Sequence, residues 1–412
     1  MVDFTKFKLQ NGLRVLIHTD MSTPMIAVNV LYNVGARDES PEKTGLAHLF
    51  EHLMFGGSVH IPDFDEPIQN AGGDNNAFTN NDITNYYDVV PKENLEIALW
   101  LESDRMLKLD INEEALDVQR KVVLEEFKET CLNQPYGDVW HHINDMAYKV
   151  HPYRWPTIGK VPKHLEDTTL EDVQSFYDKY YHPNNAILTL AGNITEAEAR
   201  PLVEKWFGDI PSGNRPSRTL PQEPPQKKLE QRINQSNVPV DAIYLAFHSP
   251  GRAAIDFYTS DLLSDILSNG PSCRLYQRLQ REQKIVTSVD AYITGSIDPG
   301  LFVVEAKPTE GYTLEQVEQA IWQELNELKN ELIPERELQK IKNKVESTIT
   351  FSEMSVINKA INLAYFELLE EPDLINREAE IYQNITAEQL RQMAQSIFTK
   401  ENCCKLHYKA ND

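Results

Sequence analysis

The sequence has few cysteines and no long apolar run. Its four cysteines, Cys131, Cys273, Cys403 and Cys404, form no CxxC pair and no disulfide framework, which indicates reduced thiols in a reducing compartment. No segment approaches the ~20 apolar residues of a membrane helix, and the first residues lack a secretory signal layout. We therefore expect no membrane span and a cytoplasmic location, or a periplasmic one if the N-terminus was trimmed.

Basic residues are also scarce, since 40 Lys and Arg stand against 63 Asp and Glu, for a net charge of −23. Such a surface repels phosphate groups, and no basic stripe offsets it, so nucleic acid is not an expected partner. The acidity favours solubility, with an acidic chamber for basic peptides as the alternative. A length of 412 residues is enough for two domains.

The chain divides near its middle at a proline-rich stretch. Residues 213–232 hold four prolines and few apolar residues, which predicts an extended linker between a domain at 1–212 and another at 233–412. The two halves share a weak repeat at an offset of 217 residues: Thr169–Thr189 and Thr386–Leu406 each read as a capped helix, a turn with Asn and a strand.

The elements expected in the first half occur in adjacent runs instead of strict alternation. Strands are predicted at Leu13–Ile17, Met25–Val34, Thr84–Val90 and Ala186–Ala191, and helices at Gly45–Phe55, Leu95–Leu107 and Glu113–Lys128. This order favours an α+β fold with a largely antiparallel sheet.

The segment Thr44–Gly57 contains the pattern H-x-x-E-H at His48, Glu51 and His52. On a helix the two imidazoles lie at i and i+4 on one face, where they can bind one Zn²⁺, and Glu51 can accept a proton from a zinc-bound water. Thr44 is the expected helix cap. The motif could decorate a surface by chance, but the rest of this helix is apolar, and burying the motif without a partner is unfavourable.

A third ligand is expected from another element. Val118–Thr130 offers Glu125, Glu126 and Glu129. We expect Val122, Val123 and Phe127 on a buried face, with Glu126 close to that face, whereas Glu129 is more consistent with a solvated stripe. Glu126 is therefore the predicted ligand.

The chain resembles the pitrilysin-type inverzincins, the family that includes insulin-degrading enzyme and mitochondrial processing peptidase. The similarity extends over nearly the whole chain, through GLAHLFEHLMFGG, AGGDNNAFTNNDITNYY, QRKVVLEEF, HPYRWPTIG and YYHPNNAILTLAGNI. It implies a zinc endopeptidase with two homologous α/β halves, facing each other as half of a clamshell. It also implies that Glu126 is the third ligand and that Asn76, Ala77, Phe78 and Thr79 form an edge strand to which a peptide substrate adds. For Asn76 a turn role is nearly as plausible.

The second half departs from the family pattern. At the 217-residue offset, Asp265 and Asn269 stand at the positions of His48 and His52, so no metal motif is expected there. The family's Arg and Tyr clamp on the substrate carbonyl falls at Gln280 (or Arg281) and Thr287. The resemblance therefore leaves three possibilities open: an active zinc endopeptidase, a zinc-carrying chain that pairs as a homodimer or with a homologous chain that supplies the clamp, and a non-catalytic assembly subunit.

Overall fold

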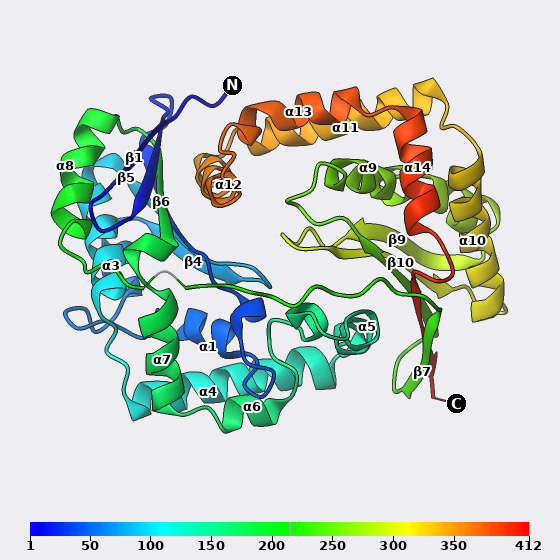
Figure 1. The fold of residues 1–412 in the computed structure, drawn as a ribbon, viewed down its shortest axis with the longest axis horizontal. Coiled ribbons are helices and arrows are strands. Elements are labelled where there is room, and N and C mark those ends of the chain that lie inside the picture. Colours follow the sequence, from blue (N-terminus) through cyan, green and yellow to red (C-terminus); the bar gives the residue numbers. More distant parts are fainter. Residues whose placement is uncertain (215, 412) are drawn as a thin grey trace. The chain divides into compact units, whose positions relative to one another are not determined.

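The computed structural model describes residues 1–214 and 216–411, which form an α+β fold with two mainly antiparallel sheets, as the sequence predicts (Figure 1). In the first sheet the strand order is β1-β2-β6-β3-β5-β4, and only the β2–β6 pair is parallel. These strands are β1 (Thr5–Lys8), β2 (Arg14–Thr19), β3 (Met25–Tyr32), β4 (Asp74–Thr79), β5 (Thr84–Pro91) and β6 (Ala186–Gly192).

The second sheet has the order β7-β11-β8-β10-β9, again with one parallel pair, β7 with β11. Its strands are β7 (Glu230–Ser236), β8 (Ala242–Ser249), β9 (Val286–Ile293), β10 (Gly300–Pro308) and β11 (Cys403–Ala410). Apart from the additional β1, the two sheets share one topology: β3 and β8 begin 217 positions apart, and so do β6 and β11. In the first sheet β6 lies between β2 and β3, and in the second sheet β11 lies between β7 and β8, as expected for a duplicated unit.

The repeat is visible in individual hydrogen bonds. The Asn185 side chain donates to the carbonyl of Tyr180 (2.8 Å), five residues earlier, and Asn402 donates to the carbonyl of Ile397 (2.9 Å) in the same way. Each bond closes the turn between a helix with a threonine capping box and the next strand. The weak match between Thr169–Thr189 and Thr386–Leu406 therefore reflects two copies of one structural unit.

The helices divide between two compact units that are not contiguous in sequence. The first unit contains residues 1–128, 155–220 and 350–377, and the second contains residues 129–154, 221–349 and 378–412. The helices are α1 (Leu46–Leu53), α2 (Asp65–Asn70), α3 (Leu95–Leu107), α4 (Glu113–Phe127), α5 (Val139–Ala147), α6 (Pro162–Glu166), α7 (Leu170–Tyr180), α8 (Glu196–Phe207), α9 (Phe257–Ser268), α10 (Leu314–Asn330), α11 (Glu335–Ser352), α12 (Val356–Leu368), α13 (Leu374–Asn384) and α14 (Ala387–Ile397), with π-helical segments at Lys128–Asn133 and Tyr276–Glu282.

Each unit takes one helix from the other half of the chain. Helix α12 packs on the first sheet, where Ala360 is fully buried with Ala27 and Ala191, and small side chains allow this close approach. Helix α5 packs on the second sheet, where its Ile143 joins a core with Val303 of β10. The two helices begin 217 positions apart, at Val139 and Val356, so the exchanged elements are themselves equivalent. The compact units therefore differ from a linear division of the chain at 212 and 233.

Side-chain hydrogen bonds hold the proline-rich stretch to the first unit before the unit boundary and to the second unit after it. Arg218 binds the Asp38 carboxylate through Nε (2.7 Å) and Nη2 (2.9 Å), within the first unit. Glu223 accepts the backbone N–H groups of residues 149, 150 and 151 within the second unit. Residue 215 of the predicted linker lies outside the described residues, and β7 begins at Glu230, so the last part of that prediction is strand instead of linker.

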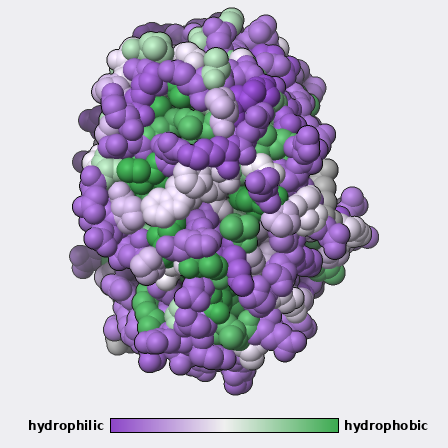
Figure 2. Space-filling model, turned by 90° about the vertical axis from the view of Figure 1, so that its left-hand side faces the viewer, coloured by the Kyte–Doolittle hydropathy of each residue, from purple (hydrophilic) through white to green (hydrophobic). Residues whose placement is uncertain are grey.

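Two further sequence features can be compared with the structure, the cysteines and the apolar helices. All four cysteines are free and buried. Within the described residues, no helix is long and apolar enough to cross a membrane, while the cellular compartment stays a prediction. Figure 2 shows one face of the molecule, on which hydrophobic side chains lie in separate patches among hydrophilic ones, in keeping with the acidic composition.

Candidate metal centre

Helix α1 carries the H-x-x-E-H residues on one face and an aromatic anchor on the other. Leu46, Leu49, Phe50 and Leu53 are buried, and the Phe50 ring lies 4.3 Å from that of Tyr181 between ring centroids. His48, Glu51 and His52 are only partly buried. The packing of the apolar face thus fixes the rotation of the helix and leaves the three polar side chains exposed to one another.

The N-terminus of α1 is capped differently from the sequence prediction. Thr44 is not the cap, because its hydroxyl contacts His164 Nδ1 (2.9 Å) and accepts the N–H of Lys160 (2.7 Å). Gly45 occupies the cap position in the left-handed region, at φ +87°, and has no side chain to accept a hydrogen bond. The carboxylate of Glu39 accepts the N–H groups of Gly45 (3.0 Å) and Ala47 (2.8 Å) instead. Sequence reasoning missed Glu39 because caps are sought next to the helix and not in an earlier loop.

Helix α4 brings Glu126 to the two histidines. Its Oε2 lies 3.7 Å from His48 Nε2 and 3.5 Å from His52 Nε2. One ligand atom from each of the three residues falls within 4.8 Å of the others, the one such group of His, Cys, Asp or Glu found among the described residues. Val123 and Phe127 are buried as expected, but Val122 is 46% exposed, so its predicted place on the buried face is wrong. Glu126 lies at the edge of that face, 38% exposed, where it can reach α1.

The electrostatics at His48 and Glu126 favour the protonation states that metal ligands need. Burial lowers the pKa of His48, which favours the neutral imidazole. The hydrogen bond with His52 lowers the pKa of Glu126 despite partial burial, so this carboxylate is ionised at neutral pH. Burial raises the pKa of Glu51, and hydrogen bonding from Thr79 opposes that rise. Neutral imidazoles and an ionised carboxylate are the forms that bind a divalent cation.

The predicted edge strand lies beside this cluster. Asn76, Ala77, Phe78 and Thr79 belong to β4, the last strand of the first sheet, which pairs only with β5. Thr79 reaches Glu51, whereas Phe78 packs on the opposite side in a core that includes residues of α12. Because side chains alternate along a strand, Ala77 shares the α1 side with Thr79. The Asn76 side chain accepts the N–H of Ala77 (2.8 Å).

The second unit has polar pairs where the first has the cluster of His48, His52 and Glu126. Asn269 donates to the Asp265 carboxylate (2.6 Å), so the side chains at the positions of His48 and His52 bind each other. At the clamp positions, Gln280 donates to the carbonyl of Thr287 (2.9 Å), and the Thr287 hydroxyl donates to that of Lys307 (3.2 Å). Both side chains are thus engaged with the backbone of their own unit.

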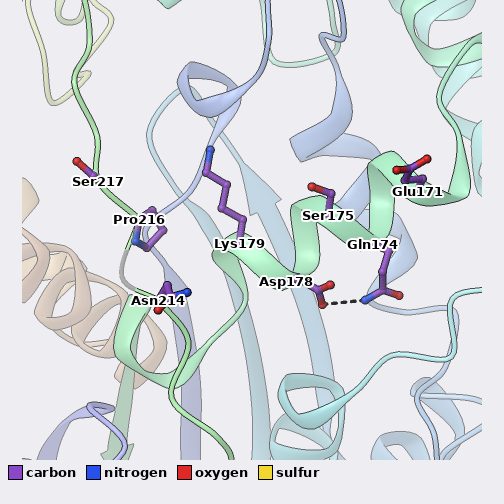
Figure 3. Close-up of a pocket in the computed structure, with 8 residues that line it drawn as sticks. All are labelled: Glu171, Gln174, Ser175, Asp178, Lys179, Asn214, Pro216 and Ser217. Atoms are coloured by element: carbon purple, nitrogen blue, oxygen red, sulfur yellow. Dashed lines mark hydrogen bonds between the residues drawn. The ribbon is translucent and has the colours of Figure 1, made fainter.

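A groove of about 640 Å³ in the first unit is distinct from the cluster. It lies between α7 and the residues Asn214, Pro216 and Ser217, and Figure 3 shows Asp178 accepting a hydrogen bond from Gln174 along its wall. Its lining combines exposed polar side chains of α7 with Asn214, Pro216 and Ser217, and none of these residues belongs to the His48 cluster. The chemistry of the site therefore resides in α1, α4 and β4.

Comparison with known proteins finds two matching family models and several relatives. The family model described as "Insulinase (Peptidase family M16)" matches residues 14–160, and that described as "Peptidase M16 inactive domain" matches residues 167–345. The chain is 29% identical to "Zinc protease PqqE" of Helicobacter pylori over 340 residues, which cover 81% of this chain and 76% of that one. It is 26% identical to "Uncharacterized zinc protease YmxG" of Bacillus subtilis over 367 residues, 88% of each chain.

The fold matches solved structures over its full length. A protease from Helicobacter pylori superposes with a TM-score of 0.93 and 26% identity, over 99% of this chain and 100% of that one. The two family models together span most of the sequence, the first of them containing His48, Glu51, His52 and Glu126. The chain therefore belongs to the M16 peptidases, the pitrilysin-type family.

Proposed function

We propose that this chain is a zinc-dependent endopeptidase in which His48, His52 and Glu126 hold the metal. The observation that carries the proposal is the convergence of the three side chains. Atoms bound at about 2.0–2.2 Å to a tetrahedral zinc ion lie about 3.3–3.6 Å apart. The Glu126 oxygen is 3.5 and 3.7 Å from the two imidazole nitrogens, so small side-chain movements would complete the site. Two imidazoles and one carboxylate are also a typical donor set for catalytic zinc.

Glu51 is the proposed general base. Zinc, when bound, supplies a Lewis acid that polarises a peptide carbonyl and makes water easier to deprotonate. Glu51 lies on the same helix face as both histidines, one residue from His52, and its carboxylate takes the proton from water and delivers it to the leaving amine. Burial raises its pKa above the ordinary value for a glutamate, the direction that favours a group that both accepts and donates a proton.

The proposed substrate is an extended peptide that pairs with β4. The outer edge of this strand is unpaired in the first sheet, and main-chain pairing binds peptides with little dependence on their side chains. Thr79 places this edge beside Glu51. The Asn76 side chain would have to release the N–H of Ala77 before that group could pair with substrate. Asn76 therefore competes with the substrate for this hydrogen bond.

Metal content and peptide cleavage test the proposal together. Purified protein should hold about one zinc ion per chain, and His48→Ala should remove it. Glu51→Gln should keep the zinc and lose nearly all cleavage of a mixed peptide library, whereas Glu42→Gln, an exposed control on the preceding loop, should change neither. Cleavage by Glu51→Gln at the wild-type rate would show that Glu51 is not the general base. A wild-type protein without zinc would refute the metal site.

A second candidate is a zinc-carrying subunit that needs a homologous chain for full activity. It is favoured by Gln280 and Thr287, which stand at the family's clamp positions and bind backbone carbonyls of their own unit. Loss of one transition-state donor typically lowers the rate by about 10²–10³. Cleavage should then rise strongly on adding a co-encoded homologue, and Thr287→Tyr should raise the activity of the chain alone. If the pure protein cleaves peptides efficiently, and neither the added homologue nor Thr287→Tyr changes the rate, the chain acts as a peptidase without a partner.

A further inference from the structure

Helix α1 has only eight residues, so its N-terminal end controls the position of His48. The first turn begins at Gly45, and a Cβ atom there would lie 2.7 Å from the carbonyl oxygen of Ile158. The backbone of residues 158–159 thus covers the start of the helix, and no side chain at position 45 can cap it. The unpaired N–H groups of this first turn need an acceptor from elsewhere.

Glu39 supplies that acceptor from a buried position. Glu39 is only 7% exposed. Its Oε1 accepts the N–H of Ala47 (2.8 Å), and its Oε2 accepts the N–H of Gly45 (3.0 Å). The indole Nε1 of Trp155 donates to the same Oε2 (3.0 Å) and to the carbonyl of Ala36 (3.1 Å). Trp155 is 1% exposed and therefore fixed by packing. One carboxylate thus joins three chain segments at the start of α1.

His48 depends on this backbone anchor more than most metal-binding histidines do. Such residues are usually oriented by a hydrogen bond from the second ring nitrogen. The Nδ1 atom of His48 is buried and has no hydrogen-bond partner within the part of the chain that the structure describes. Without a partner on Nδ1, the position of the ring depends on the helix backbone and on the neighbouring His52 ring, whose centroid is 4.9 Å away. Ala47, which Glu39 holds, is the residue before His48.

We propose that Glu39, anchored by Trp155, is a positioning residue for the metal site, which sets the place of His48 through the N-terminus of α1. Glu39 touches neither metal nor substrate in this role. The inference rests on the proposed function for the identity of the metal. It assigns a task to the HPYRWPTIG segment, whose Trp155 holds Glu39 and whose Gly159 lies against Thr44 and Gly45.

The competing explanation is that Glu39 only stabilises the fold. Catalytic metal sites lose affinity when their ligands move by about 0.5 Å, whereas a purely structural residue would change unfolding without changing the folded site. Zinc affinity and the visible absorption of a cobalt-substituted protein, both measured on folded protein, separate the two explanations because they report the geometry of the site.

The test compares Glu39→Ala, Glu39→Gln and Trp155→Phe with Glu42→Ala, an exposed glutamate on the same loop. Zinc affinity, from competition with a chelator, should fall about 10–100-fold in Glu39→Ala, as for other residues that orient ligands. Glu39→Gln keeps one oxygen acceptor, so its zinc affinity should be higher than that of Glu39→Ala. The zinc affinity of Trp155→Phe should lie between that of Glu39→Ala and that of the wild type. The cobalt spectrum should shift in Glu39→Ala and stay unchanged in Glu42→Ala.

Folded Glu39→Ala with wild-type zinc affinity and cobalt spectrum would overturn the inference. If this variant fails to fold, Glu39→Gln and Trp155→Phe decide, and wild-type affinity in both overturns it as well. A wild-type protein that binds no zinc in the same assay refutes the proposed function, and with it this inference. That result is seen before any variant is made, so the two failures are distinguishable.

Discussion

Replacing Glu126 with glutamine should weaken zinc binding far more than the same change at neighbouring glutamates. The substitution preserves the size of the side chain but removes the charge that faces His48 and His52 at 3.7 and 3.5 Å. Structural zinc sites bind with about 10–16 kcal/mol in total, or about 2.5–4 kcal/mol for each of four ligands. We therefore expect the zinc Kd of Glu126→Gln to rise by about 10²–10³.

Two controls make this prediction specific. Glu125 is exposed and pairs with Lys128 at 2.6 Å, and Glu129 is exposed in the π-helical segment that follows. Surface pairs contribute about 0–1 kcal/mol, so Glu125→Gln and Glu129→Gln should leave zinc affinity almost unchanged. The assay is chelator competition at neutral pH with circular dichroism to verify folding. If Glu129→Gln weakened zinc binding more than Glu126→Gln, the ligand assignment would be wrong by one helical turn.

Three further predictions concern stability, folding and substrate binding. Burial, followed by the nearby Asp261 charge, raises the pKa of Asp265 to about 6 from an ordinary 3.8, so its stabilising effect is fully present below about pH 4 and is lost as pH rises through 6. Asp265→Asn should thus gain about 1–2 kcal/mol on the wild type between pH 4 and pH 8 in denaturant unfolding, after allowance for partial exposure; a difference in unfolding free energy that does not vary with pH would contradict this. Residues 1–212 expressed alone lack α12, so apolar residues of the first sheet become exposed and the fragment should aggregate, as light scattering can show; a stable monomer would refute the exchange as a requirement for folding. Asn76→Ala frees the Ala77 N–H and should lower KM for an unstructured peptide while kcat stays constant; an unchanged KM would remove Asn76 from substrate binding.

Much of the candidate site could be predicted because its residues are close in sequence. His48, Glu51 and His52 lie within one helical turn or slightly more, so helix geometry alone places them on one face. The α1, α3 and α4 helices were predicted to within about two residues, because strong apolar periodicity marks them. Predictions failed where a distant segment competes with a local one: Thr44 was expected to cap α1, but Glu39 does so and Thr44 meets His164.

The sequence by itself determined the local elements, the metal-binding pattern and the duplication of the chain. These follow from residue spacing, which acts over a few residues, and from a repeat that can be found by comparing the halves. Only the tertiary structure decided that Glu126 faces α1, that Glu39 and Trp155 hold the start of that helix, and that α5 and α12 pack on the sheets of the opposite halves. Such contacts depend on which apolar surfaces cover each other, and any sufficiently apolar helix face could have covered either sheet. The choice is made by the fit of small residues such as Ala27, Ala191 and Ala360, which a linear pattern does not reveal.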